Sequence, residues 1–325
     1  MGQEKMSATL TPKVDQATIG IDISKDRLDV HLHPAGQIEQ FDNDRKGHAK
    51  LIAWTRPRQP TRIIFEATGA YHRALEKALG KAGLPAVKIN PLQARRFAEA
   101  TGKRVKTDPV DAAMLARFGH AIQPDIPPAR DETIDILKEL LVARRALVKD
   151  RTAALNRAKT LTLALLKHQN QQRLDQIEAQ ITAIDHKQAA IVAAQETLKA
   201  RSDILVSIPG LGATTARALL VDLPELGTMD HKQAASLTGL APVTRQSGNW
   251  HGKSFIQGGR ANIRHALYMP ALVAIRFNPP LKEKYLALRA AGKPPKLAIV
   301  VIMRKLVVIA NALLRDNRKW TPEMA

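Results

Sequence analysis

The stretch ATIGIDISKDRLDVHLHPAGQIEQFDN, residues 17–43, decides the fold of the first half of the chain. It opens with an apolar, partly β-branched run, ATIGIDIS, and the segments RLDVHLH and QIEQFDN follow at hairpin spacing. This pattern predicts a start made of three antiparallel strands.

After this start the pattern alternates between helical and extended segments. Strands are expected in TRIIFEATG (61–69) and PAVKIN (85–90). Helices are expected in HAKLIAWTR (48–56), AYHRALEKALGKAG (70–83), PLQARRFAEATG (91–102) and PVDAAMLARFGHA (109–121). Three strands followed by such an alternation predict an α/β mixed sheet of the ribonuclease-H kind.

The segment from Ala129 to Ile208 contains neither Gly nor Pro, which favours long helices. Apolar residues recur there every seven positions, at Ile134, Leu141, Val148 and Leu155, and again at Ile177, Ile184, Ile191 and Leu198. This period indicates a coiled coil. The two series are out of phase, so we expect two helices or one interrupted helix, with the polar run HQNQQR (168–173) in the gap. Dimerisation is favoured over packing within one chain only.

From SIPGLG (207–212) onward the pattern indicates a second, mostly α-helical domain. The expected organisation is a tail over 1–16, the mixed-sheet domain over 17–128, the coiled coil over 129–201 and the helical domain over 202–325. The apolar stretch LAIVVIMRKLVVIANALL (297–314) has Arg304 and Lys305 at its centre, where charge is costly in lipid, and is interpreted as a buried helix.

The charge balance favours nucleic acid as partner. The chain has 50 Lys and Arg against 30 Asp and Glu, a formal charge of +20. Solubility or attraction to a membrane surface would be other reasons for such an excess. The absence of cysteine excludes a disulfide framework, a zinc ribbon and a thiol nucleophile. With no apolar signal region in MGQEKMSATLTPKVDQ, a cytoplasmic location is expected.

Four carboxylates stand at the ends of the expected elements. Asp22 ends the strand in GIDIS, and Glu66 ends the strand in FEATG. In KTDPVDAAMLA, Pro109 is expected at the first helical position, so that Asp108 caps the helix and shares one side with Asp111. A single such acid is usually only a solvated strand end or a cap. Four together are typical of Mg²⁺-dependent phosphodiester chemistry, in which carboxylates hold metal ions about 4 Å apart.

GIDIS, FEATG and KTDPVDAAMLA resemble the DEDD motif of the RuvC-like transposases of the insertion-sequence one-hundred-and-ten family, and Piv-type DNA invertases are similar. The resemblance covers nearly the whole chain. It implies that Asp22, Glu66, Asp108 and Asp111 are Mg²⁺ ligands. It also implies a coiled coil, a C-terminal transposase domain, target and donor DNA as substrates, a guide (bridge) RNA, and assembly as a dimer of dimers.

The second half of the chain is basic. No acidic residue occurs between Asp230 and Glu283, which excludes a carboxylate metal site there and favours phosphate binding. The candidate nucleic-acid contacts are Arg245, Lys253, Arg260 and Arg264, together with Lys103, Arg104 and Lys106 in the first half.

Ser247, in RQSGNWHGK, is the candidate nucleophile, because Arg245, His251 and Lys253 could stabilise its alkoxide or the phosphate that it attacks. A Ser before Gly is usually a turn former, and Ser254, Thr244 and Thr238 are competitors. The family resemblance implies a catalytic serine in this context, which would join DNA through a phosphoserine. SIPGLGATTA resembles the hairpin of a helix-hairpin-helix motif, with a plain helix-turn-helix joint as the alternative.

Two other functions stay open on the sequence. One is a metal-dependent nuclease or resolvase in which water attacks and Ser247 is structural. The other is a non-catalytic scaffold that binds DNA or RNA. If no guide RNA is used, a Piv-like reaction directed by the protein alone is the alternative.

Overall fold

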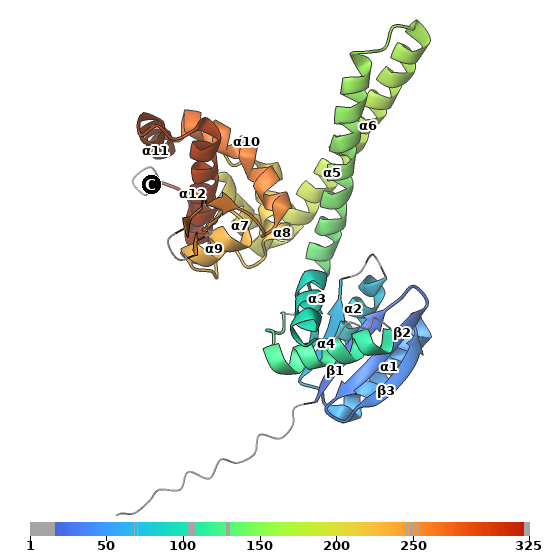
Figure 1. The fold of residues 1–325 in the computed structure, drawn as a ribbon. Coiled ribbons are helices and arrows are strands. Elements are labelled where there is room, and N and C mark those ends of the chain that lie inside the picture. The colour runs from blue at the N-terminus through green and yellow to red at the C-terminus, as the bar shows by residue number, and fades with distance from the viewer. Residues whose placement is uncertain are drawn as a thin grey trace, which may run out of the picture. The chain divides into compact units, whose positions relative to one another are not determined.

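A computed structural model describes residues 17–67, 69, 71–102, 108–127, 131–244, 246–247, 250–252 and 254–321, without the side chains at 108, 109, 246, 250 and 251. The chain divides into two compact units, Met1–Arg130 and Asp131–Ala325, and each is described by itself (Figure 1). Lys103, Arg104, Lys106, Arg245 and Lys253 fall outside the described residues.

The first unit contains a five-stranded mixed sheet with helices on both faces (Figure 1). Its elements in chain order are β1 (Thr18–Ile23), β2 (Arg27–His33), β3 (Gln37–Asp42), α1 (Arg45–Thr55), the 3₁₀ turn η1 (Arg56–Arg58), β4 (Arg62–Glu66), α2 (His72–Lys81), β5 (Ala86–Ile89), α3 (Pro91–Ala100) and α4 (Asp108–Ile122).

The strand order is β3-β2-β1-β4-β5. The first three strands are antiparallel, whereas β4 runs parallel to β1 and β5 runs parallel to β4. The expected three-stranded start and the mixed sheet are therefore confirmed. The two central strands, β1 and β4, both end at the same edge of the sheet, where Asp22 and Glu66 stand.

Alternation along the strands divides the side chains between two cores. Ile19, Ile21 and Phe65 are fully buried on the face covered by α1 and α2. Ile64 is fully buried on the opposite face, in a cluster with residues of β5, α3 and α4. Burial on both faces explains why β1 and β4 are nearly continuous apolar runs.

The second unit is mostly helical. Its elements in chain order are α5 (Glu132–Ala158), α6 (Ala164–Ala194), α7 (Glu196–Val206), α8 (Ala213–Asp222), α9 (His231–Leu237), the short strands β6 (Pro242–Val243), β7 (Gln246–Ser247), β8 (Trp250–His251) and β9 (Phe255–Ile256), then α10 (Ala261–Phe277), α11 (Pro279–Ala290) and α12 (Pro295–Arg315).

Helices α5 and α6 form an antiparallel pair within one chain. Arg144 binds Asp185 through two hydrogen bonds of 3.0 Å, and one end of the pair is tied by Arg151 to Glu178 at 3.1 Å. Residues later in α5 thus meet residues earlier in α6, which defines the antiparallel direction. The heptad residues at the base of the pair join a core that α7 and α8 share.

The break between these helices lies at residues 159–163 and not at the polar run HQNQQR, which is inside α6. The expectation of two helices is confirmed, and its boundary was wrong. The hydroxyl of Thr160 donates to the Arg157 carbonyl at 3.0 Å, a local bond that competes with helix continuation. Asn170, from the polar run, is buried and donates to the Ala154 carbonyl at 3.1 Å.

Helix α12 is the central helix of the C-terminal bundle. By length and composition it could cross a membrane, but 56% of its most apolar window is buried inside the protein. Ile302, Leu306 and Val307 belong to the largest hydrophobic core, which they share with α7 to α11. The interpretation of this stretch as a buried helix is confirmed.

Candidate active site

The register of the central strands places two of the predicted acids next to each other. Ile21 of β1 is paired with Phe65 of β4, and the residues that follow are Asp22 and Glu66. Because alternate residues share a face, Asp22 lies on the face of Gly20, and Glu66 on the face of Ile64. Both acids therefore stand at the carboxyl edge of the sheet, on the face that α4 covers. Both are half-buried.

Helix α4 packs with its backbone directly on β1. A Cβ atom at Gly20 would lie 2.1 Å from the carbonyl oxygen of Ala112 and 2.4 Å from the nitrogen of Ala116. Near the other end of the helix, a Cβ at Gly119 would lie 2.7 Å from the Thr18 side chain. Thus α4 crosses β1 in the opposite direction, and its first turn lies at the carboxyl end of the strand.

This crossing brings the first turn of α4, which contains the last two predicted acids in its sequence, to the same edge. Asp111 is half-buried and directly precedes Ala112, whose backbone touches Gly20, two residues before Asp22. Asp108 is the first residue of α4, whereas the sequence pattern placed the first helical position at Pro109, a difference within the usual variation of helix ends. The Asp108 side chain lies outside the described part of the structure. The sheet and one helix therefore bring Asp22, Glu66 and the first turn of α4 together.

Among the described residues, no three His, Asp or Glu side chains lie close enough to one another to hold a metal ion. The donor chemistry nevertheless fits Mg²⁺, since the acids that meet at this edge offer only carboxylate oxygens.

A further acid borders this edge, and the sequence patterns did not indicate it. Asp29 of β2 is directly opposite Asp22 in the antiparallel ladder and is only 1% exposed. Its carboxylate accepts hydrogen bonds from Arg27 Nε at 3.1 Å and Gln40 Nε2 at 2.6 Å. The only available signal was an acid within the alternating run RLDVHLH. The contact with Arg27 is an ion pair, so the charge of Asp29 is balanced within its own strand.

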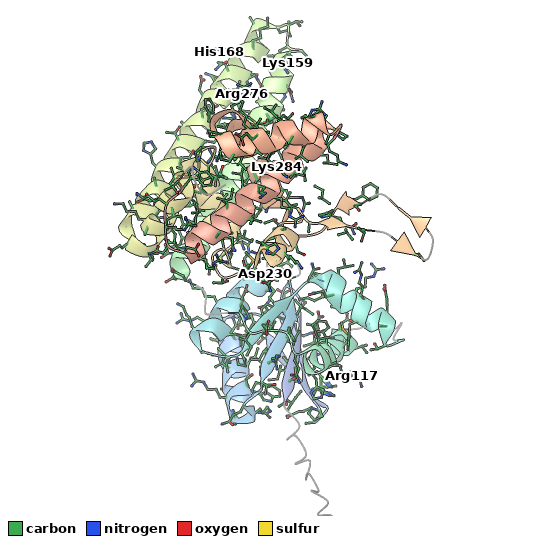
Figure 2. All side chains as sticks on the ribbon, turned by 90° about the vertical axis from the view of Figure 1, so that its left-hand side faces the viewer. Arg117, Lys159, His168, Asp230, Arg276 and Lys284 are labelled. Atoms are coloured by element: carbon green, nitrogen blue, oxygen red, sulfur yellow. The ribbon has the colours of Figure 1, made fainter. Side chains whose placement is uncertain are left out.

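Ser247 lies on a projecting two-stranded arm in the second unit. The base of the arm is the β6–β9 ladder, in which Val243 is paired with Phe255, and its outer part is the β7–β8 ladder, in which Ser247 is paired with Trp250. Figure 2 shows the arm extending from the helices of its unit. Ser247 is exposed. Its expected neighbours Arg245 and Lys253, and the side chain of His251, lie outside the described residues.

Arg260 is engaged in binding other parts of its own unit. Its guanidinium forms two 2.6 Å hydrogen bonds with Glu225 and a 2.8 Å hydrogen bond with the Asp222 carbonyl. Burial raises the pKa of Glu225, but hydrogen bonding and charge from Arg260 outweigh it, and the pKa is lowered overall. Arg264 likewise donates to the carbonyls of Gly258 and Thr238. In this structure both arginines are hydrogen-bonded to other parts of the second unit.

The loop SIPGLG joins α7 to α8. Gly210 has φ of +107°, a left-handed conformation that favours glycine, and Gly212 is the N-cap of α8 without a side-chain hydrogen bond. Ala213 and Thr214 are exposed, so the first N–H groups of α8 face solvent. This arrangement is compatible with both sequence interpretations, the hairpin and the plain joint.

The sheet and its edge carboxylates define a class of protein, the α/β enzymes that carry acids at the carboxyl ends of central strands. Comparison with known families makes this specific. Residues 19–168 match a transposase family named for DEDD and IS110, and residues 202–286 match the family described as Transposase IS116/IS110/IS902. The chain belongs to the IS110 family of transposases.

Individual relatives agree with this assignment. The pilin gene-inverting proteins of Moraxella lacunata and Moraxella bovis are each 32% identical over 316 residues, covering 93% of this chain and 97% of theirs. An uncharacterized protein of insertion element IS110 from Streptomyces coelicolor is 30% identical over 154 residues, which cover 46% of this chain and 38% of that protein. Both comparisons place the chain among DNA recombinases and transposases.

Proposed function

We propose that this chain cuts and rejoins DNA, with the carboxylates at the edge of the sheet and Ser247 as the two halves of its chemistry. The observation that carries the proposal is the meeting of Asp22, Glu66 and the first turn of α4 at one edge. The strand order, with three antiparallel strands followed by two parallel ones, supports the RuvC-like or ribonuclease-H-like assignment.

Asp22, Glu66, Asp108 and Asp111 would hold Mg²⁺, which when bound supplies positive charge at the reacting phosphate. The carboxylates would hold these cations and balance their charge. Without bound cations, the negative charge of these acids would repel the phosphates of DNA.

Ser247 would supply the attacking oxygen. Its Oγ forms a bond to phosphorus as the bond from phosphorus to one sugar oxygen breaks, and the proton lost by the serine balances the proton gained by that sugar oxygen. Attack by a sugar hydroxyl of another strand then reverses the step and frees the serine. The phosphodiester energy is kept in the serine linkage, so no nucleotide cofactor is needed. The exposure of Ser247 on the arm supports this role.

The two halves of this chemistry belong to two separate compact units of the chain. We propose that they meet on DNA in a dimer of dimers, with Ser247 and the carboxylates contributed by one chain or by two. We also propose that a guide RNA selects the target and donor DNA, on the strength of the family resemblance. Sequencing of RNA that copurifies with the protein tests this, and only heterogeneous cellular RNA would favour selection by protein alone.

The first test is a denaturing assay for protein that becomes linked to labelled DNA in the presence of Mg²⁺. The wild type should form the linked species, and Ser247→Ala should form none. Ser254→Ala is the matched control, because Ser254 is an exposed hydroxyl on the same arm. Asp22→Asn should abolish both nicking and linkage. Nicking that survives in Ser247→Ala, without any linked species in the wild type, would assign the chain to the water-dependent nucleases instead.

A further inference from the structure

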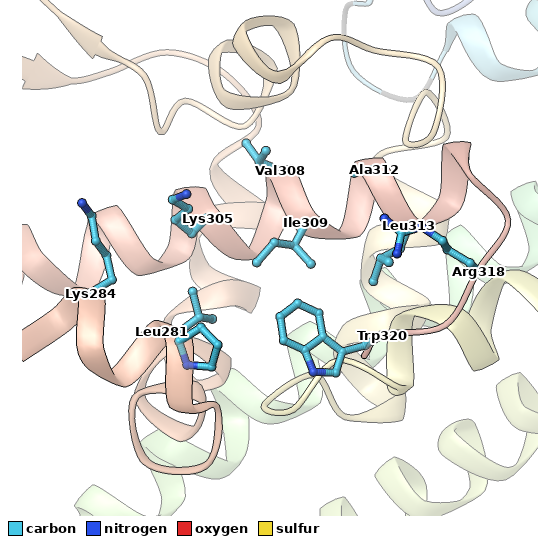
Figure 3. A pocket seen from close by; sticks show the side chains of 10 residues that line it. Leu281, Lys284, Lys305, Val308, Ile309, Ala312, Leu313, Arg318 and Trp320 are labelled. Atoms are coloured by element: carbon cyan, nitrogen blue, oxygen red, sulfur yellow. The ribbon is translucent and has the colours of Figure 1, made fainter. Parts of the chain in front are cut away.

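A cavity of about 350 Å³ lies between α11, α12 and the segment that follows α12. None of the residues that line it belongs to the proposed reactive sites. Its middle is apolar. Ile309 of α12 and Leu281 of α11 stand around the indole of Trp320, as Figure 3 shows. The cavity therefore offers an aromatic surface flanked by aliphatic side chains.

The backbone of Trp320 is tied to another part of the unit, and its side chain packs against the hydrophobic core. The N–H of Trp320 donates to Ser207 Oγ at 2.9 Å, and that hydroxyl donates to the Ile204 carbonyl at 2.6 Å. The segment after α12 is thus tied to the end of α7, while the Trp320 side chain stays half-buried. An aromatic ring fixed in this way needs little ordering when a ligand stacks on it.

Cations stand at both ends of this apolar middle. Lys284 and Lys305 lie together at one end, and Arg318 lies at the other (Figure 3). Arg318 Nε is 3.5 Å from Asp316 Oδ2, a long contact, and that carboxylate is also bound by Arg315 at 2.9 Å. None of the residues that line the cavity is acidic. The site therefore fits a ligand with a flat apolar centre and an anionic group at each end.

We propose that this cavity binds one unpaired nucleotide of a DNA or RNA strand, with its base on Trp320 and its flanking phosphates at Lys284 and Lys305 on one side and at Arg318 on the other. Proteins that bind single strands combine aromatic stacking with such cations. A base inside a duplex hides both faces against its neighbours, so only an unpaired base can stack here. An apolar peptide would bring no anionic group to Lys284 and Lys305.

The proposal adds a strand-binding site to the proposed function, because strand exchange and pairing with a guide both leave nucleotides unpaired. It needs neither Ser247 nor the carboxylates. It can therefore be tested in full-length protein that carries Ser247→Ala, in buffer without divalent metal. Failure of the recombination chemistry would leave this binding unaffected.

The experiment measures fluorescence anisotropy of labelled oligo-dT and oligo-U, with a matched duplex in a third arm. Trp320→Leu keeps an apolar side chain and should weaken single-strand binding by about tenfold, the effect of one lost stacking contact. Trp320→Phe keeps an aromatic ring and should retain most of the affinity for single strands. The double variant Lys284→Glu and Lys305→Glu should also lower the salt dependence by about 0.7 per lost phosphate contact. Lys282→Glu, an exposed lysine of the same helix outside the cavity, is the matched control.

Location is tested separately by ultraviolet crosslinking of an oligonucleotide that carries one 4-thiopyrimidine. The crosslinked peptide should contain Trp320. The dT and U arms then identify DNA, RNA or both as the source of the nucleotide. A crosslink confined to other peptides would overturn the proposal. So would equal losses in Lys282→Glu and the double variant, or equal weakening of duplex and single-strand binding, with circular dichroism confirming that each variant is folded.

Discussion

Gly20 sets how closely α4 approaches β1, and through that contact it sets the position of Asp111 relative to Asp22. The helix backbone occupies the space where a Cβ atom would be, with the Ala112 oxygen 2.1 Å from that point. Backbone cannot move aside as the end of a flexible side chain can. At the scale of single residues, the site therefore depends as much on this missing side chain as on the acids.

Gly20→Ala should destabilise the first unit by about 1–3 kcal/mol, the usual result of forcing atoms into a packed core, and should reduce Mg²⁺-dependent DNA cleavage by displacing the first turn of α4. Thermal unfolding and a nicking assay measure the two effects. Gly80→Ala is the control, because Gly80 lies in α2 with open space at its Cβ position. Gly80→Ala should leave DNA cleavage unchanged and raise the free energy of unfolding by about 0.5–1 kcal/mol. An unchanged melting temperature in Gly20→Ala would contradict this packing.

Among the elements, the α5–α6 pair is joined to the C-terminal helices by a charged cluster on Asp185. Its carboxylate receives Arg144 of α5 at 3.0 Å and Arg217 of α8 at 2.8 Å. Burial raises the pKa of Asp185, but the hydrogen bonds and charges of both arginines outweigh it and lower the pKa overall. The Arg217 side chain is only 10% exposed, so Asp185 balances a positive charge that is largely removed from water.

Asp185→Asn should lower the free energy of unfolding at neutral pH by about 2 kcal/mol, since breaking a partly buried pair leaves a cation uncompensated. Because the folded-state pKa is depressed, the unfolded chain binds more protons in acid. The stabilisation is therefore full above the unfolded-state pKa of about 4 and disappears as pH falls through the folded-state value.

Denaturant titrations between pH 3 and 7 measure this, and the gap between wild type and Asp185→Asn should shrink toward the acid end. Glu178→Gln is the control, because it removes an ion pair that lies in solvent. The side chains of Arg151 and Glu178 are 35% and 54% exposed, and exposed ion pairs contribute less than about 1 kcal/mol to stability. Equal losses of unfolding free energy in both variants would show that Asp185 contributes no more stability than an exposed ion pair.

On the scale of the whole molecule, the turn between α5 and α6 presents an apolar group to solvent. Leu163 and Leu165 are 64% and 67% exposed, and Leu155, a predicted heptad residue, is 49% exposed. Some of the heptad residues pack in the core at the base of the α5–α6 pair within one chain, whereas these leucines are exposed. Clusters of exposed apolar side chains are typical of protein interfaces, which supports contact between copies of the chain at this turn.

Leu163→Ser combined with Leu165→Ser should shift the mass distribution toward smaller assemblies without lowering the melting temperature, since both side chains are exposed in the single chain. Mass photometry across a concentration series measures the shift. Leu286→Ser, at a leucine 54% exposed on α11, should leave the distribution unchanged. A double variant that assembles like the wild type would exclude this turn from the interface.

The sequence by itself determined the features that depend on local patterns of residues. Alternation and helical periodicity predicted β1 to β5, α1 to α4 and the buried α12, and strand ends marked Asp22 and Glu66. Such patterns depend on neighbours within a few residues, so one chain segment is enough to reveal them.

Only the tertiary structure decided the features that depend on contacts between distant segments. It placed Asp111 beside β1 through the backbone contact at Gly20, buried Asp29 opposite Asp22, and engaged Arg260 with Glu225. It also ended α5 before the polar run and brought Trp320 to Lys284 and Lys305. In each case the partners lie on different elements, and packing, rather than any local preference, selects which side chains meet.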